Sequence, residues 1–247
     1  MIIHQVYGLF KDGKPMNDLF TAGSTKWREY CDRNGHIYKL WNAEQCEELV
    51  NTYSEVKNYY YDVKYSIMKA DIIRFLILYN FGGIYSDLDV FPNKNVIEID
   101  ESILTLCTYP NKKADIDIEL ISSQKYNKDL YKFITEYIPK MIIEKDNIEV
   151  YKNWKIRYVF QTTGPRSFMR FLKLNKIQYN TVNILHLSDK EIYGEIDLDQ
   201  YLEYDFLSYF SMSYFQDIHK KNKVVSYKKK GKKTILYKNI KENNLTE

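Results

Sequence analysis

Apolar residues recur at helical spacing along residues 65–79 and predict a buried helix there. Residues 80–83, which contain two adjacent glycines, end that helix, and the apolar run at 84–91 predicts a strand that stops before Pro92. Asp87 and Asp89 bracket a single leucine near the end of this strand. Because residues i and i+2 of an extended strand point to the same face, the two carboxylates are expected to project together.

The rest of the pattern alternates strands and helices. Strands are expected at residues 1–7 and 36–41, and helices at 25–33, with Ser24 as N-cap, and after Asn42, whose first turn holds Glu44 and Gln45. This order is typical of a parallel α/β sheet. Later strands are expected at 102–108, 116–122 and 181–187, and later helices at 127–143, kinked at Pro139, and at 165–174, starting with Pro165.

Length and charge bound the organisation of the chain. With 247 residues, of which 45% are hydrophobic and 28% charged, one globular domain is expected over residues 1–219. The net charge is +3, but the segment from His219 onward holds ten Lys and two Glu, so the body carries about −5. Residues 220–247 are expected to be a partly ordered lysine-rich tail, either solvated or touching an anionic membrane surface. An acidic body argues against nucleic acid as a partner.

Cysteine usage and the absence of long apolar runs indicate the compartment. Cys31, Cys46 and Cys107 form neither a C-x-x-C pair nor an even set, so reduced thiols are expected. No leader-like segment opens the sequence, and no apolar run reaches the ~20 residues that cross a bilayer. The expectation is a soluble cytoplasmic protein, with the tail able to add peripheral membrane contact.

Asp71 and Arg74 are further candidates for chemistry. They lie at i and i+3 on the predicted helix, so they share one face of it, and that face is otherwise apolar. An unpaired charge there would be costly, so one interpretation is a structural ion pair and the other is a binding task. Gly82 and Gly83 would let the backbone approach a ligand closely, and paired carboxylates suit a hard divalent cation.

Together these residues resemble glycosyltransferase family 32, the group with a sugar-binding region containing DXD. The resemblance is carried by the run from Lys69-Ala-Asp71 and Arg74, through Gly82-Gly83-Ile84-Tyr85, to Asp87-Leu88-Asp89-Val90. The opening Ile2-Ile-His4-Gln5-Val-Tyr7 and the turn Thr163-Gly164-Pro165 are similar to further parts of the family pattern. The likeness covers most of the first 95 residues and then thins to short islands.

The resemblance implies a GT-A fold, a single Rossmann-like α/β domain with a mostly parallel central sheet flanked by helices. It also implies Mn²⁺ or Mg²⁺, and a nucleotide-sugar donor, a UDP-sugar in preference to a GDP-sugar. A hexose-type sugar would pass, with retention of configuration, to a glycan, lipid-linked or protein acceptor. Asp87 and Asp89 would serve the ion and the diphosphate, and Asp71 and Arg74 the donor sugar. Tyr7 would stack on the base, with Gly83 and Tyr85 also in the donor site.

The chemistry of such a transfer assigns roles to these groups. A divalent ion would offset the charge of the leaving diphosphate, while the sugar passes through an oxocarbenium-like state. Arg74 can orient hydroxyls or offset charge but cannot act as a base. The resemblance implies Asp71, Arg74 and Asp89 as the catalytic residues. A front-face displacement is expected, and the alternative is a covalent glycosyl-enzyme on Asp117 or Glu119. The resemblance also implies His219 as the candidate third metal ligand, and the alternative is a surface histidine beside the lysine tail.

Two other functions fit parts of the pattern. A metal-dependent phosphohydrolase could use the paired aspartates, although it would need further carboxylates converging from other strands. A non-catalytic protein could bind sugar nucleotides or polyanions, with the lysine tail as its working part. The combination of Asp71, Arg74, Asp87 and Asp89 favours the transferase, because a simple binder needs no metal site.

Overall fold

The computed structural model describes residues 1–10, 15–93, 97–108, 116–149, 151, 155–186 and 206–208. Within these residues an eight-stranded sheet has the order β2-β1-β3-β6-β5-β7-β8-β4. Four of its strand pairings are parallel and three are antiparallel. The strands are β1 (Ile2–Val6), β2 (Ile37–Trp41), β3 (Gly83–Ser86), β4 (Val90–Pro92), β5 (Thr105–Thr108), β6 (Ile116–Ser123), β7 (Asn180–His186) and β8 (Phe206–Ser208).

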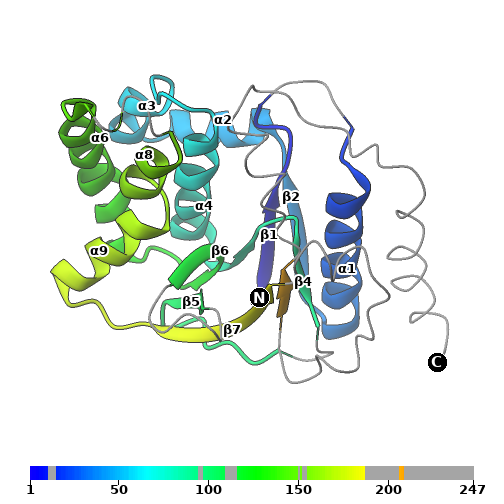
Figure 1. Cartoon of the computed structure of the whole chain (residues 1–247). Helices are drawn as coiled ribbons and strands as arrows, with labels where there is room; N and C mark the ends of the chain where they lie inside the picture. Colours follow the sequence, from blue (N-terminus) through cyan, green and yellow to red (C-terminus); the bar gives the residue numbers. More distant parts are fainter. Residues whose placement is uncertain are drawn as a thin grey trace.

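Helices cover both faces of this sheet (Figure 1). Helix α1 (Asp18–Asn34) lies on one side, and α4 (Ile67–Phe81) lies with most of the other helices on the opposite side. The remaining helices are α2 (Ala43–Asn51), α3 (Ser54–Tyr60), α5 (Lys128–Lys132), the π-helix η1 (Phe133–Tyr137), α6 (Ile138–Asp146), α8 (Lys155–Thr162) and α9 (Pro165–Asn175). The result is the helix–sheet–helix layering expected when strands and helices alternate along a chain.

Side chains of the central strands point alternately to the two faces of the sheet, so the same strands contribute to a hydrophobic core on each face. Ile84 of β3 packs with Trp27 of α1, whereas its neighbour Tyr85 belongs to the cluster that contains the buried apolar residues of α4 from Ile72 onward. Helix α4 is mostly apolar on all sides, and Met68 and residues 71–78 are buried, because the helix runs between the sheet and the outer helices. A charged side chain on this helix therefore has to find its partners within the protein.

Several predicted elements are confirmed. Asn42 caps α2 in a capping box with Gln45, whose side chain accepts from the Asn42 N–H in return. The glycine turn ends helix α4 as expected, with Gly82 as its C-cap, and α9 begins at Pro165. The kink predicted at Pro139 corresponds to the π-helical turn η1, which lies just before the proline. This turn accommodates Pro139, which has no N–H to donate to a helical hydrogen bond.

Two predicted boundaries are wrong. Helix α1 begins seven residues earlier than expected, because Asn17 caps it by accepting from the Phe20 N–H, and Ser24 is buried in mid-helix against Tyr38. The strand predicted at 84–91 is broken in two. Strand β3 stops at Ser86, and the chain turns through residues 87–89, with the Val90 N–H donating to the Asp87 carbonyl at 3.2 Å.

Some predictions fall outside the described residues. The lysine-rich tail at 220–247 and His219 both lie there. Among the residues that the structure does describe, no helix combines the length and the apolar character needed to cross a membrane.

Candidate functional site

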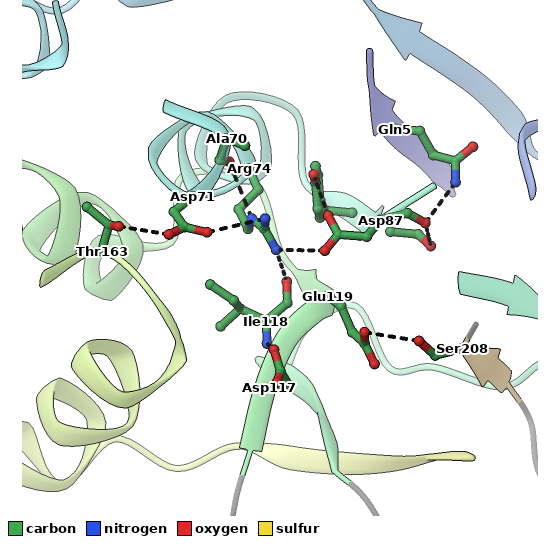
Figure 2. A network of polar contacts seen from close by, with 12 residues as sticks. Gln5, Ala70, Asp71, Arg74, Asp87, Asp117, Ile118, Glu119, Thr163 and Ser208 are labelled. Atoms are coloured by element: carbon green, nitrogen blue, oxygen red, sulfur yellow. Dashed lines mark hydrogen bonds and ion pairs between the residues drawn. The ribbon is translucent and has the colours of Figure 1, made fainter. Parts of the chain in front are cut away.

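The carboxylate of Asp87 lies at the carboxyl end of β3 and is held from two sides (Figure 2). Arg74 Nη1 lies 3.3 Å from its Oδ2, and the Tyr85 hydroxyl donates to its Oδ1 at 2.9 Å. The Arg74 guanidinium also lies over the Tyr85 ring, 4.9 Å from its centroid. Arg74, Tyr85 and Asp87, three of the predicted donor-site residues, are thus in direct contact with one another.

The backbone of Asp87 is fixed as firmly as its side chain. Gln5 Nε2 of β1 donates to the Asp87 carbonyl at 3.1 Å, and the Asp87 N–H donates to the Glu119 carbonyl of β6 at 2.7 Å. Tyr38 of β2 in turn donates to Gln5 Oε1. Three neighbouring strands therefore determine where the turn carries its acidic side chains, which is the kind of support that a preorganised site needs.

Arg74 joins helix α4 to two strands. Its Nη2 lies 3.3 Å from Asp71 Oδ1, and its Nη1 donates to the Ile118 carbonyl at 2.6 Å as well as approaching Asp87. Asp71 and Arg74 are only 6% and 5% exposed. The i, i+3 pair predicted from the sequence is present, and it is one link in a longer chain of polar groups that reaches the DXD turn.

Thr163 completes this chain from the far side of α4. Its hydroxyl donates to Asp71 Oδ2 at 2.7 Å, across a separation of 92 residues in sequence. The sequence reasoning identified the Thr163-Gly164-Pro165 turn but gave it no place in the site. The one sequence feature that could have placed Thr163 in the site was the likeness of its turn to a family motif. Neither spacing nor periodicity links residue 163 to residue 71.

Two more acids approach from an irregularity in β6. Leu106 of β5 pairs with Ile121, yet the next residue, Cys107, pairs with Asp117, so three residues of β6 bulge out of that ladder. The bulge contains Glu119, a buried carboxylate that accepts from the Ser208 hydroxyl at 3.1 Å. Asp117 and Glu119, singled out from the sequence as alternative nucleophiles, are therefore close to the aspartate turn.

The gathering of carboxylates shifts their protonation. Burial raises the pKa of Asp71 to about 6, although Arg74 and the Thr163 hydroxyl oppose the shift. Burial and the nearby Glu119 raise the pKa of Asp117 to about 7. Burial also raises the pKa of Asp87 and, together with Asp87 and Glu119, raises that of Asp89 well above its usual value. Such crowding favours any cation that would neutralise it.

These shifts predict how stability depends on pH in cation-free buffer. A carboxyl whose pKa is raised by folding stabilises the fold below its unfolded pKa, and this contribution is lost as pH rises through the folded value. Burial lowers the pKa of His4 to about 4, so His4 makes the stability increase with pH. This opposite effect ends at the ordinary His pKa of 6.5. We therefore expect the midpoint temperature of thermal unfolding to decrease as the pH rises from 6.5 to 8.

Thermal unfolding in EDTA and in Mn²⁺ checks this pH dependence. Mn²⁺ is expected to reduce the fall, and the substitution Asp117→Asn is expected to reduce it without any cation, because that side chain then no longer titrates. An unfolding midpoint that stays level or rises from pH 6.5 to 8 in EDTA would contradict the raised carboxyl pKa values.

The remaining predicted residues lie at different places. Tyr7 follows β1 near the same sheet edge, half-buried, with its N–H bonded to the Trp41 carbonyl. Gly83 begins β3 at the opposite end from Asp87, and a Cβ there would overlap the Ile2 carbonyl, so the close approach assigned to a ligand is made to strand β1. His4 donates to the Gly82 carbonyl and accepts from Trp41 Nε1, so it has a structural role in the core.

The donor atoms at the turn fit a hard divalent cation. In the described part of the chain no three His, Cys, Asp or Glu side chains converge in a ready-made metal cluster. The Asp87 and Asp89 carboxylates are nonetheless oxygen donors of the type that Mg²⁺ and Mn²⁺ prefer, and Mg²⁺ sites commonly use one or two carboxylates plus phosphate oxygens. The crowding that raises the pKa of both groups supports the fit.

Part of the chain is similar to known glycosyltransferases. Residues 17–106 match the glycosyltransferase sugar-binding region containing DXD motif. Inositol phosphoceramide mannosyltransferase 1 of Schizosaccharomyces pombe is 36% identical over 91 residues, which are 36% of this chain and 27% of that protein. Inositol phosphoceramide mannosyltransferase 3 of the same yeast is 42% identical over 60 residues, 24% of this chain and 17% of that protein. The chain thus matches about a quarter or less of the length of these curated relatives.

A solved structure supports the fold. The PaToxG glycosyltransferase superposes with a TM-score of 0.50 at 15% identity, over 70% of this chain and 69% of that one. The helix-flanked mixed sheet is therefore the GT-A fold that the sequence implied. The region that contains Asp71, Arg74 and the DXD turn is thus similar to the DXD-containing glycosyltransferases of the family 32 type.

Proposed function

We propose that the chain is a metal-dependent, retaining glycosyltransferase that moves a hexose-type sugar from a nucleotide-sugar to a hydroxyl acceptor. The observation that carries this proposal is the continuous chain Thr163–Asp71–Arg74–Asp87, whose first three members are buried and whose last, partly exposed member belongs to the DXD turn. Buried charges without a task are commonly replaced by apolar residues at little cost in stability, so a buried ion network beside a pair of crowded carboxylates indicates function.

In this proposal the two ends of the network have different tasks. Asp87 and Asp89 would hold a Mn²⁺ or Mg²⁺ ion, which when bound would neutralise charge on the leaving diphosphate. Asp71 and Arg74 would take the sugar hydroxyls, because a carboxylate accepts and a guanidinium donates in fixed directions. Burial works against the Arg74 charge, yet the nearby carboxylates raise its pKa above the ordinary value, so it stays cationic.

The transfer itself needs few covalent roles from the protein. The bond between the anomeric carbon and the diphosphate oxygen breaks, and the acceptor oxygen bonds to that carbon from the same face. The acceptor proton passes to the departing diphosphate oxygen, so charges and atoms balance without a protein base. The residues act by positioning the donor and by offsetting charge, effects that account for most of the barrier lowering in such reactions.

A UDP-sugar is the proposed donor in preference to a GDP-sugar, and a glycan, lipid-linked sugar or protein the proposed acceptor. The curated relatives are mannosyltransferases of inositol phosphoceramide, so a membrane glycolipid is one acceptor to include in the trials. A cytoplasmic enzyme with peripheral membrane contact through the lysine-rich tail would suit such an acceptor.

Donor hydrolysis tests the proposal. We expect the purified chain to release free sugar slowly from one member of a panel of UDP- and GDP-sugars in Mn²⁺, and to release none in EDTA. Asp89→Asn should reduce this release by roughly 100-fold or more, because it removes a charge facing the cation. Asp32→Asn makes the same chemical change on the exposed face of α1 and should leave release unchanged.

Each outcome of this test is decisive. Release that survives EDTA, or that Asp89→Asn leaves intact, would contradict metal-dependent catalysis at the DXD turn. No release from any donor, with no thermal stabilisation by UDP or GDP in Mn²⁺, would overturn the transferase function altogether.

A further inference from the structure

We infer that Thr163 is a positioning residue of the donor-sugar site, which fixes the Asp71 carboxylate so that Asp71 and Arg74 together recognise the hydroxyls of the transferred sugar. This inference rests on the proposed function and extends it to a residue that contacts no ligand itself. Its basis is the pair of opposed contacts on Asp71, with Arg74 at Oδ1 and the Thr163 hydroxyl at Oδ2 (Figure 2).

The Asp71 carboxylate needs both contacts to be held in one orientation. A carboxylate attached to a helix by a single side-chain carbon can rotate about two bonds, and one partner fixes only one of its oxygens. Arg74 is on the same helix, so that contact moves with α4, whereas Thr163 comes from the junction of α8 and α9. The hydrogen bond of 2.7 Å therefore ties the position of the acid to a second element.

The local structure around Thr163 is built to hold the hydroxyl in place. Thr163 is fully buried, and its N–H donates to the Val159 carbonyl of α8 at 3.1 Å. A Cβ on Gly164 would lie 2.9 Å from the Phe160 Cα, so the α8–α9 junction closes tightly only with glycine there. Pro165 then starts α9. Each residue of the Thr-Gly-Pro turn thus contributes to presenting one hydroxyl to Asp71.

The arrangement also favours the ionised form of Asp71. Burial and the charge of Asp87 raise the pKa of Asp71, and Arg74 and the Thr163 hydrogen bond oppose this rise, which leaves the pKa at about 6. A neutral Asp71 would present a hydroxyl donor in place of an acceptor and would lose its attraction to Arg74. Thr163 therefore influences both the direction and the charge of the group that would accept from the sugar.

The test compares two isosteric substitutions at adjacent buried threonines. Thr163→Val removes the hydrogen bond to Asp71, whereas Thr162→Val removes only bonds to the Tyr158 and Val159 carbonyls within α8. With the donor that the wild type hydrolyses, Thr163→Val should lower kcat/KM roughly 10- to 100-fold. Affinity for the free nucleoside diphosphate in Mn²⁺ should stay unchanged, because that product carries no sugar. Thr163→Ser should restore most of the activity, and Thr162→Val should keep it.

Two further readouts distinguish positioning from a merely structural role. The acidic limb of the pH profile should move to higher pH in Thr163→Val, since Asp71 loses a group that lowers its pKa. In an Asp71→Asn background, Thr163→Val should cause little further loss, because the two side chains act as a unit. If Thr163→Val does not fold, Thr163→Ala and Thr163→Ser form the same comparison.

The outcomes separate this inference from the proposed function. If the wild type turns over a donor and Thr163→Val matches it, the positioning role is wrong while the transferase function stands. Equal losses in donor turnover and nucleotide affinity, or additive losses with Asp71→Asn, would also overturn the positioning role. A wild type that turns over no donor overturns both.

Discussion

Arg74→Met is expected to abolish measurable donor turnover and to destabilise the fold by about 3–5 kcal/mol, the usual cost of removing one partner from a buried ion pair. The side chain is 5% exposed and contacts Asp71, Asp87 and the Ile118 carbonyl. Methionine fills similar volume, so the loss comes from two carboxylates and a carbonyl left without their shared donor. The destabilisation should be smaller at pH 5 than at pH 8, because without Arg74 the aspartates can fold in the neutral form.

Chemical denaturation and donor hydrolysis measure the two effects of Arg74→Met separately. Arg170→Met places the same substitution on the exposed face of α9 and should change neither quantity by much. Arg74→Lys restores the charge without the planar fork, so it should recover part of the stability while turnover remains at least 10-fold reduced. Full activity in Arg74→Met would show that the network is structural only, which is the interpretation that the sequence left open.

The local elements of this fold could be predicted because their signals are local. The Asn42–Gln45 capping box, the apolar period of α4 and the proline at the start of α9 each act within a few residues. The i, i+3 spacing of Asp71 and Arg74 likewise needed only one helix to become a contact. For the same reason the motif indicated the family before any tertiary structure was known.

The geometry of the DXD turn could not be predicted in this way. An apolar run with acids at i and i+2 reads as a strand, but β3 and β4 pair with different partners, β6 and β8. The chain must change direction between them, and the bonds to the Asp87 carbonyl from Gln5 and Val90 stabilise the turn. Of these partners only Val90 is near in sequence, so periodicity alone could not predict the contacts that form the turn.

The contributions of β6 and of Thr163 depend on still longer separations. A three-residue bulge decides that Glu119 approaches the turn, and no composition signal marks its position. Thr163 meets Asp71 only because α8 and α9 pack beside α4. Family resemblance named candidate ligand-contacting residues such as Asp71 and Asp87, but it did not identify the residues that hold them in place, because those depend on how distant elements pack.

The second large effect is expected from Gly23→Ala, a substitution that would ordinarily stabilise a helix by roughly 1 kcal/mol. Gly23 lies in mid-helix on α1, and a Cβ there would overlap the carbonyl oxygen of Leu88, the residue between the two aspartates. Helix α1 is also tied to the same segment by Trp27 Nε1, which donates to the Val90 carbonyl at 2.9 Å. An added methyl group must therefore displace either the helix or the DXD turn.

We expect Gly23→Ala to lose about 1–3 kcal/mol of stability and roughly 100-fold in turnover, since shifts near 1 Å in catalytic groups have costs of that size. Gly35→Ala is the control, because a Cβ at that helix end meets no atom within 4 Å. It should lose about 1 kcal/mol from its left-handed backbone and keep full turnover. A Gly23→Ala protein as stable and active as the wild type would mean that α1 can move away without carrying the turn. Loss of both stability and turnover in Gly23→Ala would show that α1 sets the position of both aspartates, even if α1 contacts no ligand.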